Sequence, residues 1–141
     1  MKKIVNLMTI CTVLIVGIVA CSNGGIDSIQ ATFFNNGETY PTGEFTTYSV
    51  SLVDSSGEPV SVEKLYFYMN MEKMNHPMEG TMKEVKEGLY EIELPLAMPG
   101  EWYVNVTIFN GKEERALDSF TVYAEGDMVM EYMRGFNSDL E

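Results

Sequence analysis

The chain has 141 residues, of which 45% are hydrophobic, and its 21 acidic and 9 basic residues give a net charge of −12 at pH 7. This length allows one domain after an N-terminal export segment is set aside. A strongly acidic chain is repelled by nucleic-acid phosphates and by anionic lipid head groups, so we expect no nucleic-acid partner.

The first twenty residues have the features of a bacterial export signal. Lys2 and Lys3 precede an uncharged apolar stretch that ends at Ala20, and Cys21 follows. A basic start and a short apolar core are typical of a signal peptide. The Ile-Val-Ala-Cys sequence at 18–21 resembles a lipobox, in which the cysteine receives a lipid and the residues before it are removed. The alternative is an ordinary signal anchor with an incidental cysteine.

This pattern predicts a lipoprotein signal peptide over 1–20, lipidation of Cys21 and a tether over 21–28. The lipid would attach the protein to the membrane, so we expect it on the extracytoplasmic face of the cell membrane. The only other cysteine, Cys11, lies inside the expected signal. The mature domain therefore has no disulfide, and a soft metal would have to bind methionine or histidine instead of thiolate.

Alternating apolar residues predict a series of short strands in the rest of the chain. The expected strands cover 29–33, 45–53, 62–71, 81–86, 89–96, 101–109 and 114–124. The most regular one places Trp102, Val104 and Val106 inward and is followed by Asn110-Gly111, a strong hairpin signal. Period-two alternation with frequent turns predicts an all-β, antiparallel β-sandwich over 29–125, with Trp102 between the two sheets.

The C-terminal residues 126–141 show no such alternation. They contain Met128, Met130 and Met133, together with two aromatic residues. We expect either a frayed helix or a disordered tail there. Its methionines are a second and weaker candidate for copper capture.

Methionine and histidine are concentrated in one stretch that does not fit a strand pattern. Residues 69–82 contain five methionines and His76, the only histidine of the chain. Pro77 cannot donate a ladder hydrogen bond, and Glu79-Gly80 is typical of a loop. We therefore expect Met74, His76 and Met78 on a loop at one end of the sandwich, where functional residues are often found.

The donor types of this segment favour copper. Thioether sulfur is a soft, neutral ligand that suits Cu(I) and binds Zn(II), Mg(II) or Ca(II) poorly, and imidazole suits both states of copper. We predict a metal site formed by Met71, Met74, His76 and Met78. Met71 could equally be a core residue at the end of its strand, and a mobile loop without a metal is the alternative for the other three residues.

The remaining methionines of the segment have other expected roles. Met69 is in phase with Leu65 and Phe67, which predicts a core position. Met82 fits either a core or a ligand position. Met98 precedes a turn and could face the same end of the sandwich as the metal site.

Four short motifs resemble the YtkA-like domain family of small exported proteins. They are residues 53–60, the approach to Met71-Glu-Lys-Met74-Asn-His76, residues 88–90 and residues 99–106. The resemblance spans about residues 28–124 and implies an immunoglobulin-like sandwich. Some relatives are linked to copper handling or to cytochrome oxidase assembly, which implies a metal role for Met71, Met74 and His76. This chain has Met-Asn-His at 74–76 where the family often has Met-Gly-His, and Met78 is added from donor chemistry alone.

We therefore expect a membrane-anchored carrier or buffer for copper, in the Cu(I) state, that passes the metal to an oxidase or another exported protein. The alternative is a metal-free interaction module of an envelope complex, with the methionines as an adaptable contact surface. We expect no enzyme, because the mature chain has no cysteine nucleophile and no phosphate-binding glycine loop. Glu91 and Glu93 have the spacing of an exposed strand face, whereas a glycosidase needs two opposed carboxylates in a cleft.

Overall fold

The computed structural model describes residues 24–141, so the signal peptide and the lipidation of Cys21 lie outside the described residues. The described residues form two 3₁₀ turns and ten strands. These elements are η1 (Ile26–Ser28), β1 (Gln30–Phe33), β2 (Thr39–Pro41), β3 (Thr46–Val53), β4 (Lys64–Asn70), β5 (Met78–Thr81), β6 (Lys83–Lys86), β7 (Leu89–Leu94), β8 (Gly100–Asn110), β9 (Glu113–Glu125), η2 (Met130–Tyr132) and β10 (Phe136–Asn137). No helix within 24–141 is long and apolar enough to cross a bilayer.

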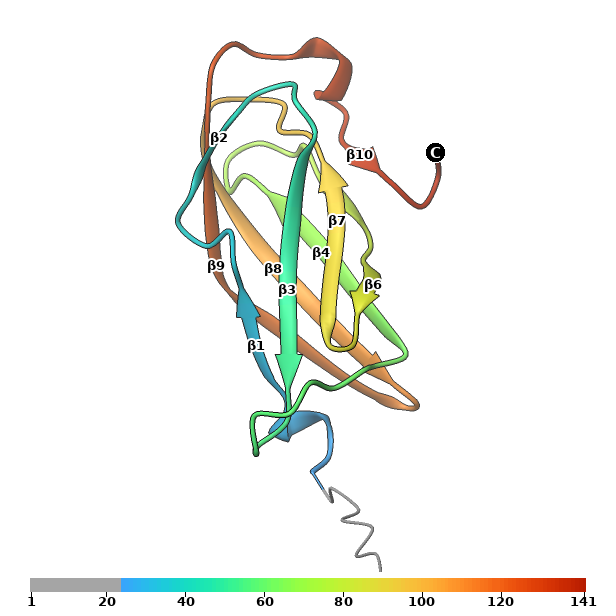
Figure 1. The fold of residues 1–141 in the computed structure, drawn as a ribbon. Coiled ribbons are helices and arrows are strands. Elements are labelled where there is room, and N and C mark those ends of the chain that lie inside the picture. Colours follow the sequence, from blue (N-terminus) through green and yellow to red (C-terminus); the bar gives the residue numbers. More distant parts are fainter. Residues whose placement is uncertain (1–23) are drawn as a thin grey trace, which may run out of the picture.

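The strands form two sheets that pack face to face (Figure 1). One sheet has the order β1-β3-β7-β6, and the other has the order β10-β5-β4-β8-β9-β2. Pairing is antiparallel except for the short outer strands β10 and β2, which run parallel to their neighbours. The predicted all-β sandwich is therefore confirmed.

The core lies between the sheets and is filled by the inward residues of the predicted alternation. Trp102 is fully buried, and its Nε1 donates to the carbonyl oxygen of Met98 at 3.0 Å. Tyr48 and Phe67 stack at 5.2 Å between ring centroids, and Phe33 lies 5.7 Å from Phe67. Each buried aromatic or aliphatic side chain of this kind contributes about 1.5–3 kcal/mol to folding, which offsets the absence of a disulfide within 24–141.

A β-bulge explains a change of phase in β9. Val104 lies opposite Phe120, but Val106 lies opposite Leu117, so two residues of β9 face the single residue Asn105. The bulge shifts the alternation of inward and outward residues by one position. Leu117 and Phe120, which are three positions apart, can therefore lie on the same face of β9.

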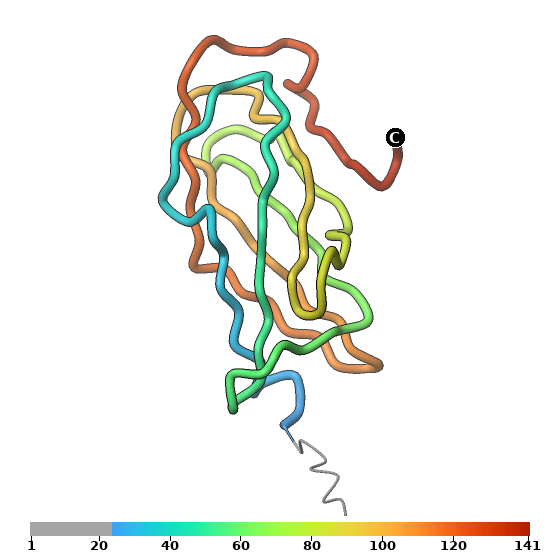
Figure 2. The backbone as a smooth tube through the Cα atoms, in the orientation of Figure 1, coloured from blue at the N-terminus to red at the C-terminus, as the bar shows by residue number. Residues whose placement is uncertain are grey.

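The N-terminal end of the described chain is fastened to the sandwich by one arginine. Nη1 of Arg115 donates to the carbonyl oxygens of Ile26, Asp27 and Ile29, the last at 2.6 Å. This attachment lies at the lower end of the molecule in Figure 2, opposite the end that the C-terminal residues cross.

The prediction of a helical or disordered tail was wrong. Residues 127–139 run across one end of the sandwich, form only the three-residue turn η2, and then add β10 to the edge of β5. The hydrogen-bond partners of this tail in the rest of the domain lie more than thirty positions earlier in the sequence. A two-residue strand has too few positions to show a period in the sequence.

Two core tyrosines differ in how their hydroxyl groups are satisfied, which gives a stability test. The Tyr48 hydroxyl is buried without a hydrogen-bond partner within 24–141, whereas the Tyr90 hydroxyl accepts from the backbone N–H of Val62 at 2.9 Å. We expect Tyr48→Phe to leave the free energy of unfolding unchanged or to raise it, and Tyr90→Phe to lower it by about 1 kcal/mol. Urea unfolding of both variants measures this, and a larger loss in Tyr48→Phe than in Tyr90→Phe would contradict it.

Candidate functional site

Three segments that are distant in sequence meet at one end of the sandwich, which we call the Met–His end. They are residues 71–77 between β4 and β5, residues 95–99 between β7 and β8, and residues 126–135 before β10. Val129 N–H donates to Ala97 O, and Phe136 N–H donates to Pro77 O, each at 2.8 Å. These bonds join the tail to both loops. Figure 1 shows the tail passing over this end.

Asn70 shapes the loop that carries the methionines and the histidine. It is the last residue of β4 and is buried. Its Oδ1 accepts from the backbone N–H of Met71 at 2.9 Å and of His76 at 2.8 Å, and its Nδ2 donates to Tyr68 Oη and to Asn75 Oδ1. A buried amide with all these bonds satisfied fixes a loop conformation. Sequence reasoning missed this residue; the available signal was an asparagine at a strand end just before the methionine segment.

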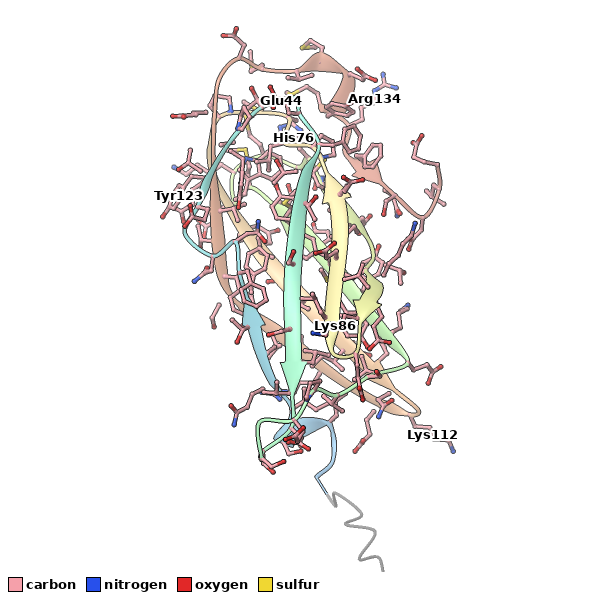
Figure 3. All side chains as sticks on the ribbon, viewed as in Figure 1. Glu44, His76, Lys86, Lys112, Tyr123 and Arg134 are labelled. Atoms are coloured by element: carbon pink, nitrogen blue, oxygen red, sulfur yellow. The ribbon has the colours of Figure 1, made fainter. Side chains whose placement is uncertain are left out.

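His76 is nearly buried, with 8% of its surface exposed. Its Nδ1 lies 2.6 Å from the carbonyl oxygen of Met133 in the tail. A carbonyl oxygen only accepts, so the hydrogen is assigned to Nδ1. In the neutral ring, Nε2 then carries the lone pair, and this atom is buried without a hydrogen-bond partner within 24–141. Figure 3 places His76 at the upper end of the sandwich, far from Lys86 and Lys112.

Met71 and Met74 lie on the same loop as His76 but outside the fully buried core. Met71 is half-buried, and a Cβ built on Gly100 would lie 2.8 Å from its Cε. Gly100, at φ +131°, therefore lets the Met71 methyl group approach the start of β8 closely. Met74 is 48% exposed. The structure thus gives this loop one half-buried and one exposed thioether.

The prediction that Met78 lies on the loop was wrong. Met78 is the first residue of β5, lies opposite Met69 and is fully buried in the core. Pro77 ends the loop just before β5, so its missing N–H does not interrupt the ladder. Met69 is fully buried as predicted, and Met82 is also buried.

The tail brings further methionines to the Met–His end. Met133 of the tail is half-buried against the core, as is Met98 of the loop between β7 and β8. Met128 and Met130 are 58% and 75% exposed. The two methionine groups that are separate in the sequence therefore share one end of the molecule.

Two tyrosines on the outer face of the six-stranded sheet have pKa values raised above the ordinary value. Partial burial raises the pKa of Tyr103, with a further contribution from Tyr68. Burial, followed by the hydrogen bond to the Glu79 carboxylate, raises the pKa of Tyr66 to about 12. These phenols are therefore not anionic oxygen ligands at neutral pH. Within 24–141, no three His, Cys, Asp or Glu side chains are grouped as in a metal site.

The role of Asn70 gives a direct test of how the loop is held. Asn70→Ala removes the partners of two backbone N–H groups, and we expect it to lower the free energy of unfolding by about 2–3 kcal/mol. We also expect faster hydrogen exchange at the His76 amide. Asn105→Ala, on the neighbouring strand β8, is the control, and we expect a change below about 1 kcal/mol because Asn105 is only half-buried. Equal effects of the two substitutions would contradict this role.

Comparisons with known proteins agree with the fold. The structure is similar to the filamin domain of Lin-41, with a TM-score of 0.51 and 15% identity over 67% of this chain and 91% of that chain. It also matches an α2-macroglobulin of Salmonella with a TM-score of 0.49 and 24% identity, but over 72% of this chain and only 6% of that one. Comparison with curated proteins gives no match. The model of the YtkA-like family matches residues 32–107, more than half of the sequence, and the chain therefore belongs to the YtkA-like family.

Proposed function

We propose that this protein is a membrane-anchored, extracytoplasmic copper-binding protein that holds Cu(I) through His76, Met71 and Met74 and acts as a carrier or buffer. The observation that carries this proposal is the His76 ring. It is nearly buried, its Nδ1 is held by the Met133 carbonyl, and its Nε2 has no partner within 24–141. A buried nitrogen left without a partner costs about 1–3 kcal/mol, and a bound metal would remove that cost.

The arrangement around His76 has the form that metal-binding histidines commonly take. Such a histidine donates its other ring N–H to a backbone carbonyl or a carboxylate, which fixes the tautomer and the ring orientation. Here the Met133 carbonyl has that role. In its neutral form the ring therefore carries its lone pair on Nε2.

The other donors of the loop favour one class of metal. The loop supplies thioethers at Met71 and Met74, and the tyrosines nearby are neutral. Thioether sulfur suits Cu(I) and binds Ca(II), Mg(II) and Zn(II) poorly, and imidazole suits both states of copper. A neutral ligand set also fits a role in which copper is passed on to an oxidase or to another exported protein. Met78 is left out of this set because its side chain fills the core.

One observation favours a second candidate function, a metal-free interaction module. Met74, Met128 and Met130 are exposed, and flexible methionine surfaces serve adaptable protein recognition. This alternative requires a partner that binds equally well with and without a copper chelator. The buried, oriented His76 is not needed for such a surface, so the copper proposal is preferred.

The copper proposal predicts a defined set of affinity losses. In an anaerobic Cu(I) titration against a chromophoric chelator, we expect His76→Phe to weaken binding at least about tenfold, and Met71→Leu and Met74→Leu to weaken it less, because each removes one donor. Met82→Leu, a buried methionine outside the loop, is the control and should bind like the wild type. Wild-type binding no tighter than that of a Met71→Leu/Met74→Leu/His76→Phe variant would refute the proposal.

The anchor gives an independent prediction. When the full chain is expressed in a bacterium, we expect it in the membrane fraction with labelled fatty acid incorporated, because acyl chains supply the membrane affinity. Cys21→Ser should move the protein out of that fraction and abolish the label, whereas Cys11→Ser should change neither. Label that persists in Cys21→Ser would show that the lipid is attached elsewhere.

A further inference from the structure

Residues 127–139 of the C-terminal tail, which we call the strap from here on, are held to the sandwich by hydrogen bonds along their whole length. At the start, Thr42 Oγ1 donates to Asp127 O at 2.7 Å, and Val129 N–H donates to Ala97 O at 2.8 Å. At the end, Ser138 N–H donates to Glu79 O at 3.0 Å. The Asp139 carboxylate accepts from the backbone N–H and the hydroxyl of Thr81, each at 2.8 Å. The strap is therefore a docked part of the domain.

Close packing holds the middle of the strap against the histidine loop. A Cβ on Gly135, whose φ is +96°, would lie 2.5 Å from Pro77 O, so a glycine is required for this approach. Phe45 makes edge-to-face contacts with Tyr132 at 6.0 Å and with Phe136 at 5.3 Å between ring centroids. The residues that make these contacts, Tyr132 and Phe136, precede and follow Met133 in the sequence.

We propose that the strap is a positioning element for His76: its docking holds the imidazole with hydrogen on Nδ1 and the lone pair on Nε2, and it is coupled to ligand binding at Nε2. The coupling to metal binding rests on the proposed function, whereas the effect of the strap on the His76 tautomer does not. No other acceptor within 24–141 bonds to Nδ1 of His76.

The coupling follows from the hydrogen bond. When the strap leaves, Nδ1 loses its acceptor, so the ring can rotate and carry its hydrogen on either nitrogen. Only the form with a free Nε2 lone pair binds a metal at that atom, and the fraction in this form scales the apparent affinity. By linkage, a ligand at Nε2 stabilises the docked strap to the same extent.

Asp139 allows the strap to be loosened without changing the donor set. Its carboxylate accepts hydrogen bonds from Thr81, the last residue of β5. His76 lies at the other end of that strand, two residues before Met78. Asp127 is the matched control, because it lies on the same strap, its side chain is exposed, and its replacement removes the same charge. We compare Asp139→Ala with Asp127→Ala in the full mature domain.

The first measurements use metal-free protein. The chain has a single histidine, so ¹⁵N spectra report the His76 tautomer without ambiguity. We expect the Nδ1–H form in the wild type and in Asp127→Ala. In Asp139→Ala we expect a mixture of tautomers and hydrogen exchange at least about tenfold faster at the amides of Gly135 and Phe136. An Nε2–H form in the wild type, or faster strap exchange with an unchanged tautomer, would overturn the inference.

A second pair of variants covers the case in which the loss of Asp139 is too mild to undock the strap. Gly135→Ala must displace the strap at Pro77, whereas Gly37→Ala, also at positive φ, meets no atom within 4 Å. Both carry the backbone strain of an alanine in this region. We expect only Gly135→Ala to change the His76 tautomer. A tautomer unchanged in Gly135→Ala, with exchange showing that the strap is undocked, would overturn the inference.

The final measurement adds Cu(I) itself. We expect Asp139→Ala to bind about three- to tenfold more weakly than Asp127→Ala, and Cu(I) to slow exchange at the strap amides of the wild type. If the wild type binds no Cu(I) but the tautomer responds to the strap, the proposed function fails and the positioning role stands. If Cu(I) binds equally to both variants while the strap amides differ in exchange, the coupling is refuted.

Discussion

The hydrogen bond from His76 Nδ1 to the Met133 carbonyl is the constraint on which the Met–His end depends. It joins two segments that lie 57 residues apart and decides which nitrogen of the only histidine can accept a partner. Asn70 holds the same loop from the other side by accepting from the His76 backbone N–H. The backbone and the ring of His76 are thus held by separate hydrogen bonds. The ring atom that remains without a hydrogen-bond partner within 24–141 is Nε2, the atom that could bind a ligand.

The sandwich was largely predictable because its core strands alternate with a period of two. Trp102, Met69 and Leu65 are inward as their phase indicates. A hairpin joins β8 to β9 as predicted, but its two turn residues are Gly111 and Lys112, one position later than the Asn110-Gly111 pair. The short strands β2, β5 and β10 were not predicted. Each has only two to four residues, and two of them pair with segments from distant parts of the sequence. Such strands are determined by tertiary contacts that leave no local pattern.

The candidate site was predictable only in part, for a related reason. Donor chemistry identified the segment, but it could not separate a core thioether from an accessible one. Met78 follows a proline and looks like a loop residue, yet it is the first inward position of β5. The contributions of Asn70 and Met133 are made by an amide and by a backbone carbonyl, respectively. A carbonyl group is common to every residue, so no sequence signal could have indicated that of Met133.

The attachment of Ile26, Asp27 and Ile29 to Arg115 has a consequence for how the molecule would stand on a membrane. The segment 26–29, blue in Figure 1, lies at one end of the sandwich, and His76 lies at the other end in Figure 3. β9, with 13 residues, has a contour length of about 40 Å at roughly 3.3 Å per residue. If Cys21 carries a lipid, as proposed, His76 lies at the end of the domain away from that attachment. Exchange partners would then be reached from the aqueous side, by soluble domains or by subunits that project from the membrane.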